Sequence, residues 1–206
     1  MDLKITTVEK FIDHTASKAP TPGGGAIAAI TGATAIALAE MVANLTIDKS
    51  GYETVTSDMK ELQKKASTMR SRFLALAEED MKVFSNFMSA LQLPKQTDKE
   101  KIARTEAIQN CYKNAALVPL EIGVLAADIF PLAQQAIEKG NKNTVTDAAI
   151  AAINARAAVK SAFLNVKINL ASIKDTLFVE ELKSTMNAIE SLVDEQEEVI
   201  ISACQL

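Results

Sequence analysis

The chain has 206 residues, 48% of them hydrophobic, which is enough for one domain with a sizeable core. Its net charge of −4 at pH 7 is spread along the chain, which argues against nucleic acid as the main partner, because such binders gather basic charge on one face. One histidine and two cysteines without ligand spacing are too few for the usual zinc site, so we expect no metal.

The N-terminal segment is charged and polar and lacks the apolar core of a secretory signal. The longest apolar stretch, residues 26–39, is shorter than the about 20 residues of a membrane span, and Glu40 follows it. We therefore expect a cytoplasmic protein without a membrane partner, in which this stretch is a buried helix. His14 is expected at the surface or at a helix cap, and Cys111 and Cys204 as buried free thiols.

Six helices are predicted, because Ala, Leu, Lys, Glu and Met dominate and no alternating strand pattern occurs. In chain order they cover residues 7–17, 22–46, 57–91, 98–140, 144–170 and 175–203. Pro22 favours the first turn of the second helix. Pro119 and Pro131 are expected to bend the fourth helix, and Gly140 indicates its C-cap. No linker divides the chain, so residues 1–206 are predicted to form one all-α domain, a bundle of five or six helices, several of them long.

The second predicted helix begins at three consecutive glycines, Gly23–Gly25. Glycines at a helix N-terminus leave backbone N–H groups accessible and let a ligand approach the main chain. A row of small residues follows on the same helix: Gly25, Ala28, Gly32, Ala35 and Ala39. No Lys-Ser/Thr pair follows the glycines, so they are not a P-loop. Two interpretations stay open, a site for an anion or a polar ring and a flexible hinge with tight helix packing.

A carboxylate interrupts the apolar face of the third predicted helix. The spacing of this face alternates between three and four residues, as in a packed bundle: Met59, Leu62, Ala66, Met69, Phe73, Leu76, Asp80, Val83 and Phe87. Burial of a carboxylate is unfavourable unless it is paired, and desolvation raises its pKa. Asp80 is therefore a candidate general acid/base. The alternative is a structural Asp paired with a Lys, an Arg or a helix N-terminus.

Amides interrupt a second face, on the fifth predicted helix. Asn165 and Asn169 continue in register a row of small residues: Ala148, Ala151, Ala155, Ala158 and Ala162. The two amides either bind a heterocycle or form a buried pair that fixes helix register. Asn143 and Asp147 lie upstream, in the loop and first turn of this helix, where Asp147 also complements the helix dipole.

Several segments match one family in the same order along the chain. They are Ala19–Gly25 (APTPGGG), Ala39–Thr46 (AEMVANLT), Lys49–Tyr52 (KSGY), Leu93–Thr97 (LPKQT), Val118–Leu120 (VPL), Gly140–Asp147 (GNKNTVTD) and Asn165–Leu170 (NVKINL). Together they resemble the formiminotetrahydrofolate cyclodeaminase/methenyltetrahydrofolate cyclohydrolase family. Thr146 replaces the serine of the family's GNxN…SD segment. The resemblance covers nearly the whole chain.

The resemblance implies an all-α homodimer with a folate site near the subunit interface. It implies a catalytic Asp in a D-x-x-x-F segment, which here is Asp80. On this hypothesis the other site residues bind the folate, with or without a polyglutamate tail, or orient Asp80: Thr21, Gly23, Gly24, Gly25, Lys49, Asn143, Asp147, Asn165 and Asn169. The chain has no room for the formiminotransferase that some members carry, so transferase activity is not expected.

The family carries out two reactions, and both pass through a tetrahedral carbon between N5 and N10 of tetrahydrofolate. The cyclodeaminase forms 5,10-methenyltetrahydrofolate from the 5-formimino compound and releases ammonia, and we place it first. The cyclohydrolase interconverts 5,10-methenyl- and 10-formyltetrahydrofolate. Neither needs redox chemistry or metal, so no cofactor is expected. A non-catalytic helical dimer that serves as a scaffold is the alternative from another class, and the acidic balance disfavours a nucleic-acid-binding bundle.

Overall fold

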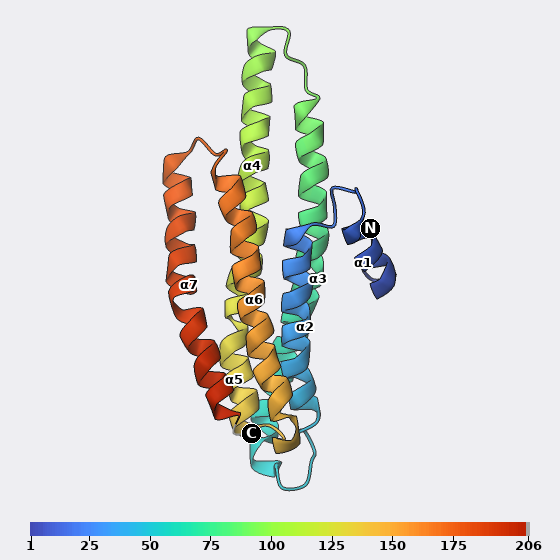
Figure 1. Cartoon of the computed structure of the whole chain (residues 1–206), viewed down its shortest axis with the longest axis vertical. Coiled ribbons are helices and arrows are strands. Elements are labelled where there is room, and N and C mark those ends of the chain that lie inside the picture. Colours follow the sequence, from blue (N-terminus) through green and yellow to red (C-terminus); the bar gives the residue numbers. More distant parts are fainter. Residues whose placement is uncertain (205–206) are drawn as a thin grey trace.

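The computed structural model describes residues 1–204, and the last two residues of the predicted domain 1–206 lie outside that range. All regular secondary structure in the described range is helical. The α-helices are α1 (Val8–Ala16), α2 (Gly24–Asn44), α3 (Thr56–Leu91), α4 (Asp98–Ala127), α5 (Ile129–Lys139), α6 (Val145–Leu170) and α7 (Thr176–Ala203), with short 3-10 turns η1 (Glu53–Val55) and η2 (Lys142–Thr144). The predicted all-α single-domain bundle is confirmed, and its long helices lie roughly along one axis (Figure 1).

Two helix boundaries differ from those predicted. The helix expected to start at Pro22 starts at Gly24, with Gly23 as an extended N-cap, so Pro22 belongs to the preceding turn. The helix expected to run from residue 98 to 140 is interrupted at Asp128 and becomes α4 and α5. Pro131 explains the interruption, because it has no N–H to donate to the carbonyl of Ala127 and its ring would clash there. In contrast, α4 continues through Pro119.

Helix α2 is the central element, packed between α3 and α6. It runs antiparallel to α6, because Gly24 at its start meets the side chain of Asn165 while Leu45 and Thr46 after its end bond Asn141, which precedes α6. The C-terminal part of α3 and the N-terminal part of α4 extend beyond the other helices, and α1 lies apart at the side of the bundle (Figure 1).

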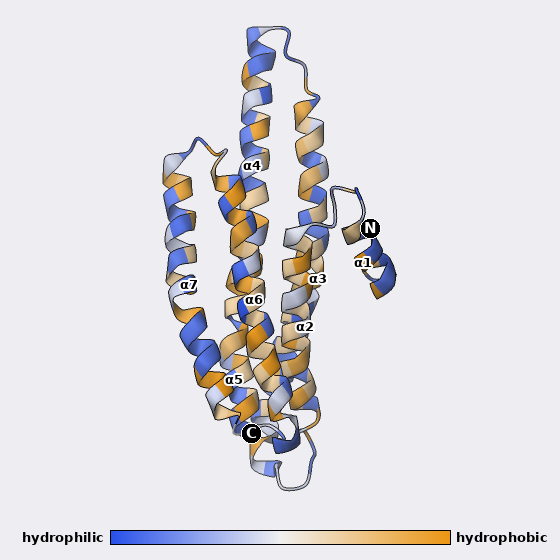
Figure 2. Ribbon diagram, in the orientation of Figure 1, coloured by the Kyte–Doolittle hydropathy of each residue, from blue (hydrophilic) through white to orange (hydrophobic). Residues whose placement is uncertain are grey.

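Small residues make the close helix contacts of the core. The predicted rows on α2 and α6 are buried, and so are most apolar positions of the predicted α3 face. Gly32 is needed where it stands, since a Cβ there would lie 2.5 Å from the ring of Phe73. Gly123 gives the same room to the ring of Phe163. Figure 2 shows apolar ribbon concentrated where α2, α5 and α6 meet.

A polar corner closes the end of the bundle where α2 ends and α6 begins. The buried hydroxyl of Thr46 accepts a hydrogen bond from the backbone N–H of Asn141 at 2.8 Å, and the Asn141 amide donates to the carbonyl of Leu45. The hydroxyl of Tyr52 accepts from the backbone N–H of Lys142 at 3.1 Å. Side chains thus join the loop after α2 to the loop before α6.

Two helical segments are long and apolar enough to cross a membrane by composition alone, α2 and residues 98–139. In this bundle, 56% of the most apolar window of α2 and 44% of that of the second segment are buried. A core helix gives the same signal, and the prediction that residues 26–39 form a buried helix is confirmed.

The single histidine and the two cysteines belong to three different helices or their caps. His14 is exposed in the last turn of α1, as predicted. Both cysteines are free thiols, as predicted. Cys204 is buried, but Cys111 is only half-buried, because it lies on α4 at the edge of a groove between α3 and α4.

Candidate active site

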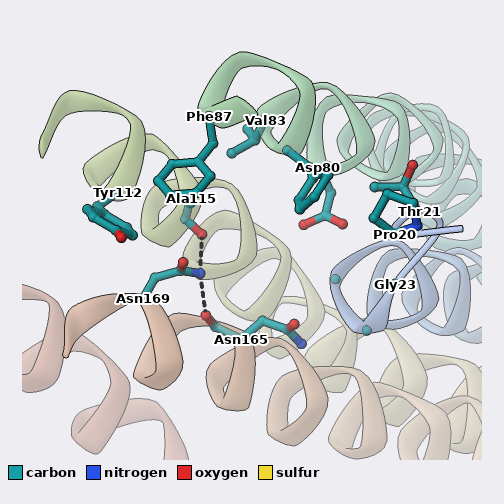
Figure 3. A pocket seen from close by; sticks show the side chains of 13 residues that line it. Pro20, Thr21, Gly23, Asp80, Val83, Phe87, Tyr112, Ala115, Asn165 and Asn169 are labelled. Carbon is teal, nitrogen blue, oxygen red and sulfur yellow. Dashed lines mark hydrogen bonds between the residues drawn. The ribbon is translucent and has the colours of Figure 1, made fainter. Parts of the chain in front are cut away.

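A cavity of about 390 Å³ opens where the start of α2, the middle of α4 and the C-terminal halves of α3 and α6 meet. Many of the residues predicted for the site line it: Thr21, Gly23, Gly24, Gly25, Asp80, Asn165 and Asn169. Figure 3 shows Asp80 above the glycine turn and the two asparagines on the facing helix. The structure therefore brings together three segments that lie far apart in the sequence.

Asp80 lies directly against the first turn of α2. A Cβ at Gly25 would lie 2.1 Å from a carboxylate oxygen of Asp80, so only glycine leaves room for this side chain. Burial raises the pKa of Asp80, and a hydrogen bond from the backbone of Ala26 lowers it by less. The pairing with a helix N-terminus, considered above as the structural alternative, is thus present. The raised pKa and the open cavity beside the carboxylate still suit a proton-transfer role.

Asn165 and Asn169 form a short ladder along α6. The Asn169 side chain donates to the backbone carbonyls of Asn165, at 2.8 Å, and of Ala115 on α4, at 2.9 Å (Figure 3). The Asn165 side chain donates to the carbonyl of Ser161 at 2.9 Å and packs against Gly24. The structural interpretation is present in part, since the side-chain nitrogens bond backbone carbonyls of α6 and α4 and not each other. Binding of a heterocycle stays a prediction, and both amides line the cavity where it would occur.

Aromatic side chains supply an apolar wall that sequence reasoning did not assign to the site. Phe84, Phe87 and Tyr112 line the cavity, and the rings of Phe87 and Tyr112 lie 5.1 Å apart between centroids. Phe87 belonged to the predicted α3 face, but nothing connected that face with Tyr112 on α4. The available signal was weak: Tyr112 is the one aromatic residue of α4.

Three predicted binding residues lie outside this cavity. Lys49 is in the loop after α2, Asn143 in η2 and Asp147 in the first turn of α6, near the polar corner. Asp147 and Asn169 are separated by 22 positions of one helix, which corresponds to about 33 Å. Within one chain, therefore, these three residues do not join the cavity that holds Asp80.

Comparison with known proteins identifies the family. Residues 7–188 match the family model described as formiminotransferase-cyclodeaminase. The chain belongs to the formiminotransferase-cyclodeaminase family. The resemblance inferred from the motifs is thereby confirmed, and the family is one of folate one-carbon enzymes.

Relatives within the formiminotransferase-cyclodeaminase family bear two names. A methenyltetrahydrofolate cyclohydrolase of Methylorubrum extorquens is 43% identical over 175 residues, which cover 85% of this chain and 84% of the relative. A formimidoyltransferase-cyclodeaminase of Rattus norvegicus is 30% identical over 92% of this chain, which spans only 34% of that larger protein. The crystal structure of formiminotetrahydrofolate cyclodeaminase from Thermotoga maritima matches with a TM-score of 0.87 at 31% identity, over 98% of this chain and 97% of the other.

Proposed function

We propose that the protein is a methenyltetrahydrofolate cyclohydrolase with Asp80 as its general acid/base. The observation that carries the proposal is the half-buried carboxylate of Asp80, held on a glycine turn at the mouth of a cavity in a chain of this family. The choice of reaction follows the relative of that name, which is 43% identical over most of both chains. This reverses the order given in the sequence analysis, where the cyclodeaminase came first although the motifs are common to both reactions.

In the proposed mechanism the ionised Asp80 takes a proton from water as the water oxygen attacks the cationic methenyl carbon. This gives a neutral tetrahedral carbinol and a protonated Asp80. The bond from the carbon to N5 then breaks: Asp80 donates its proton to N5 and accepts the proton of the hydroxyl group. The products are 10-formyltetrahydrofolate and a protonated Asp80, which returns one proton to solvent. We propose that no metal or other cofactor takes part.

The cyclodeaminase reaction is the second candidate, favoured by the close match to a structure of that name. There N10 attacks the formimino carbon on N5, and the proton of N10 passes to the formimino nitrogen. Asp80 would donate a second proton to that nitrogen, so that the carbon–nitrogen bond breaks and ammonia leaves. The same cavity and the same carboxylate serve both reactions, because both pass through a carbon bonded to N5 and N10.

A direct assay distinguishes the candidates. The absorbance of the methenyl compound is followed with purified protein and each of the two substrates. Loss of 5,10-methenyltetrahydrofolate faster than its spontaneous hydrolysis, with no turnover of the formimino compound, supports the cyclohydrolase. A rise from 5-formiminotetrahydrofolate with stoichiometric ammonia supports the cyclodeaminase. Turnover of neither by a folded protein would contradict the enzyme proposal and favour the scaffold alternative.

We further propose that the protein acts as a cytoplasmic homodimer paired through an outer stripe on α2 and α6. The stripe consists of side chains that are exposed or half-exposed at spacings of three, four or seven: Ile27, Thr31, Thr34, Leu38 and Met41 on α2, and Ile150, Ile153, Ala157, Leu164 and Ile168 on α6. No member is charged, and Leu164 and Ile168 are 66% and 71% exposed. An uncharged and largely apolar exposed face of this kind is typical of a protein–protein interface.

This pairing gives a role to Lys49, Asn143 and Asp147. They lie at one end of the outer stripe and the Asp80 cavity lies at the other, because α2 and α6 are antiparallel. A two-fold axis through the middle of the stripe brings the stripes of the two subunits into contact, and the two stripes then run in opposite directions. The three residues of the partner subunit then approach the cavity of this one. Two such sites form in each dimer.

A further inference from the structure

The side-chain amide of Asn169 is locked in one orientation. An amide nitrogen carries two hydrogens, and those of Asn169 are directed to the carbonyls of Ala115 and Asn165. A reversed amide would place its oxygen against two carbonyl oxygens, which is unfavourable. The only hydrogen-bonding capacity left on this side chain is therefore the acceptor Oδ1, on the wall of the cavity.

The surroundings of Asn169 suit the edge of a flat ring. Tyr112 lies beside it, and Phe87 is in contact with Tyr112 (Figure 3). Asp80 is on a different wall, on α3, whereas Asn169 is on α6. A bicyclic ring in this cavity thus has one edge toward Asp80 and another toward a fixed acceptor.

The proposed substrate has a donor at the corresponding position. In a pterin ring N5 and N8 lie on opposite long edges, so an N5 turned toward Asp80 turns N8 toward Asn169. In tetrahydrofolate, its 5-formimino and 5,10-methenyl derivatives, and dihydrofolate, N8 carries a hydrogen. In fully oxidised folic acid N8 is a bare acceptor, and two acceptors facing each other leave both unsatisfied.

We propose that Asn169 selects the reduction state of the pterin by accepting a hydrogen bond from N8–H. This inference rests on the proposed folate site, and it holds for either of the two reactions. Asn169 is a specificity-determining residue in this role, separate from proton transfer by Asp80. Loss of one such hydrogen bond, with an acceptor left unpaired, corresponds to about tenfold or more in affinity.

The test compares dihydrofolate with folic acid, because both have an unprotonated N5 while only dihydrofolate has N8–H. Calorimetric titration of the wild-type protein is expected to show dihydrofolate binding about tenfold or more tightly than folic acid. In Asn169→Leu the ratio is expected to fall toward one. Asn187→Leu, at an exposed position of α7 that does not line the cavity, makes the same chemical change and is expected to keep the ratio.

Equal affinity for the two ligands in the wild-type protein would overturn the inference without any variant, so it does not depend on whether Asn169→Leu folds. Asn169→Ala provides a smaller side chain without an acceptor at the same position, and an undiminished ratio in either folded variant would also overturn it. Titration with tetrahydrofolate tests the folate site itself. If tetrahydrofolate binds and the ratio of dihydrofolate to folic acid affinity is near one, only this inference fails. If none of the three folates binds, the proposed function fails with it.

Discussion

At the scale of single residues, the glycines of α2 have two different functions. Gly25 faces a carboxylate at the edge of a cavity, whereas Gly32 faces the fully buried ring of Phe73. An added methyl group can displace the Asp80 side chain into the cavity, but the Phe73 ring has nowhere to go. The same substitution at these two positions of one helix therefore separates catalysis from stability.

We predict that Gly25→Ala lowers kcat by about 100-fold, since misplacement of a catalytic group by about 1 Å has effects of this size. Its thermal unfolding midpoint should change little. Gly32→Ala should instead lower stability by about 1–3 kcal/mol through overpacking and keep most of its kcat. Steady-state kinetics and thermal unfolding of both variants check the prediction, and a Gly25→Ala enzyme with wild-type kcat would contradict it.

The raised pKa of Asp80 has consequences for both activity and stability. Burial makes ionisation of Asp80 less favourable in the folded state than in the unfolded state. The contribution of Asp80 to the free energy of unfolding is therefore fully present below its ordinary pKa of 3.8, and it is lost as pH rises through the raised pKa. Asp80→Asn cannot ionise, so its stability should not show this decline. We predict that the free energies of unfolding of the two proteins, measured with denaturant, diverge over this pH window, and that the variant becomes the more stable relative to the wild type.

Activity should have the opposite pH dependence. Attack by water needs the ionised carboxylate, so kcat should rise as pH passes through the raised pKa, and Asp80→Asn should lower kcat by about 10²–10⁴-fold. Stopped or continuous absorbance assays across the same pH range measure this. Wild-type turnover by a folded Asp80→Asn dimer would refute the role of Asp80.

At the scale of elements, the outer stripe of α2 and α6 is the feature with the clearest test. Ile168→Glu would bury a charge in the proposed interface, so we predict that it shifts the protein from dimer to monomer. Leu177→Glu is the matched control, because Leu177 is 84% exposed at the start of α7 and does not belong to the stripe. Analytical ultracentrifugation over a range of concentrations decides. Unchanged sedimentation of the Ile168→Glu protein would place the interface elsewhere.

The sequence was sufficient for most elements and for part of the site. Periodicity identified the buried faces of α2, α3 and α6, and the one polar residue in the α3 face, Asp80, proved to line the cavity. The interruption at Asp128 was predicted only as a bend in one helix, because two prolines offered two positions for a bend and only Pro131 interrupts the helix. Tyr112 was not predicted as a site residue, because the contact between α3 and α4 depends on tertiary packing, which the periodicity of one helix does not reveal.

At the scale of the whole molecule, the proposed reversed pairing of two chains would divide each site between them. We predict that two inactive variants, Asp80→Asn and Asn143→Ala, regain activity when their subunits are mixed. The expected level is about one quarter of the wild type, because half of randomly formed dimers are mixed and each has one site with both residues intact. Mixed subunits that stay inactive, although hybrid dimers form, would show that Asn143 and Asp80 act within one chain.

The contact of Asp80 on α3 with the first turn of α2 has a consequence for the catalytic cycle. Gly23 provides no side-chain cap for α2, so the first turn of this helix is held in part by a carboxylate from α3. An ionised carboxylate stabilises a helix N-terminus more than a protonated one does. If Asp80 takes and returns a proton in every cycle, this contact with the first turn of α2 is strengthened and weakened in step with the chemistry.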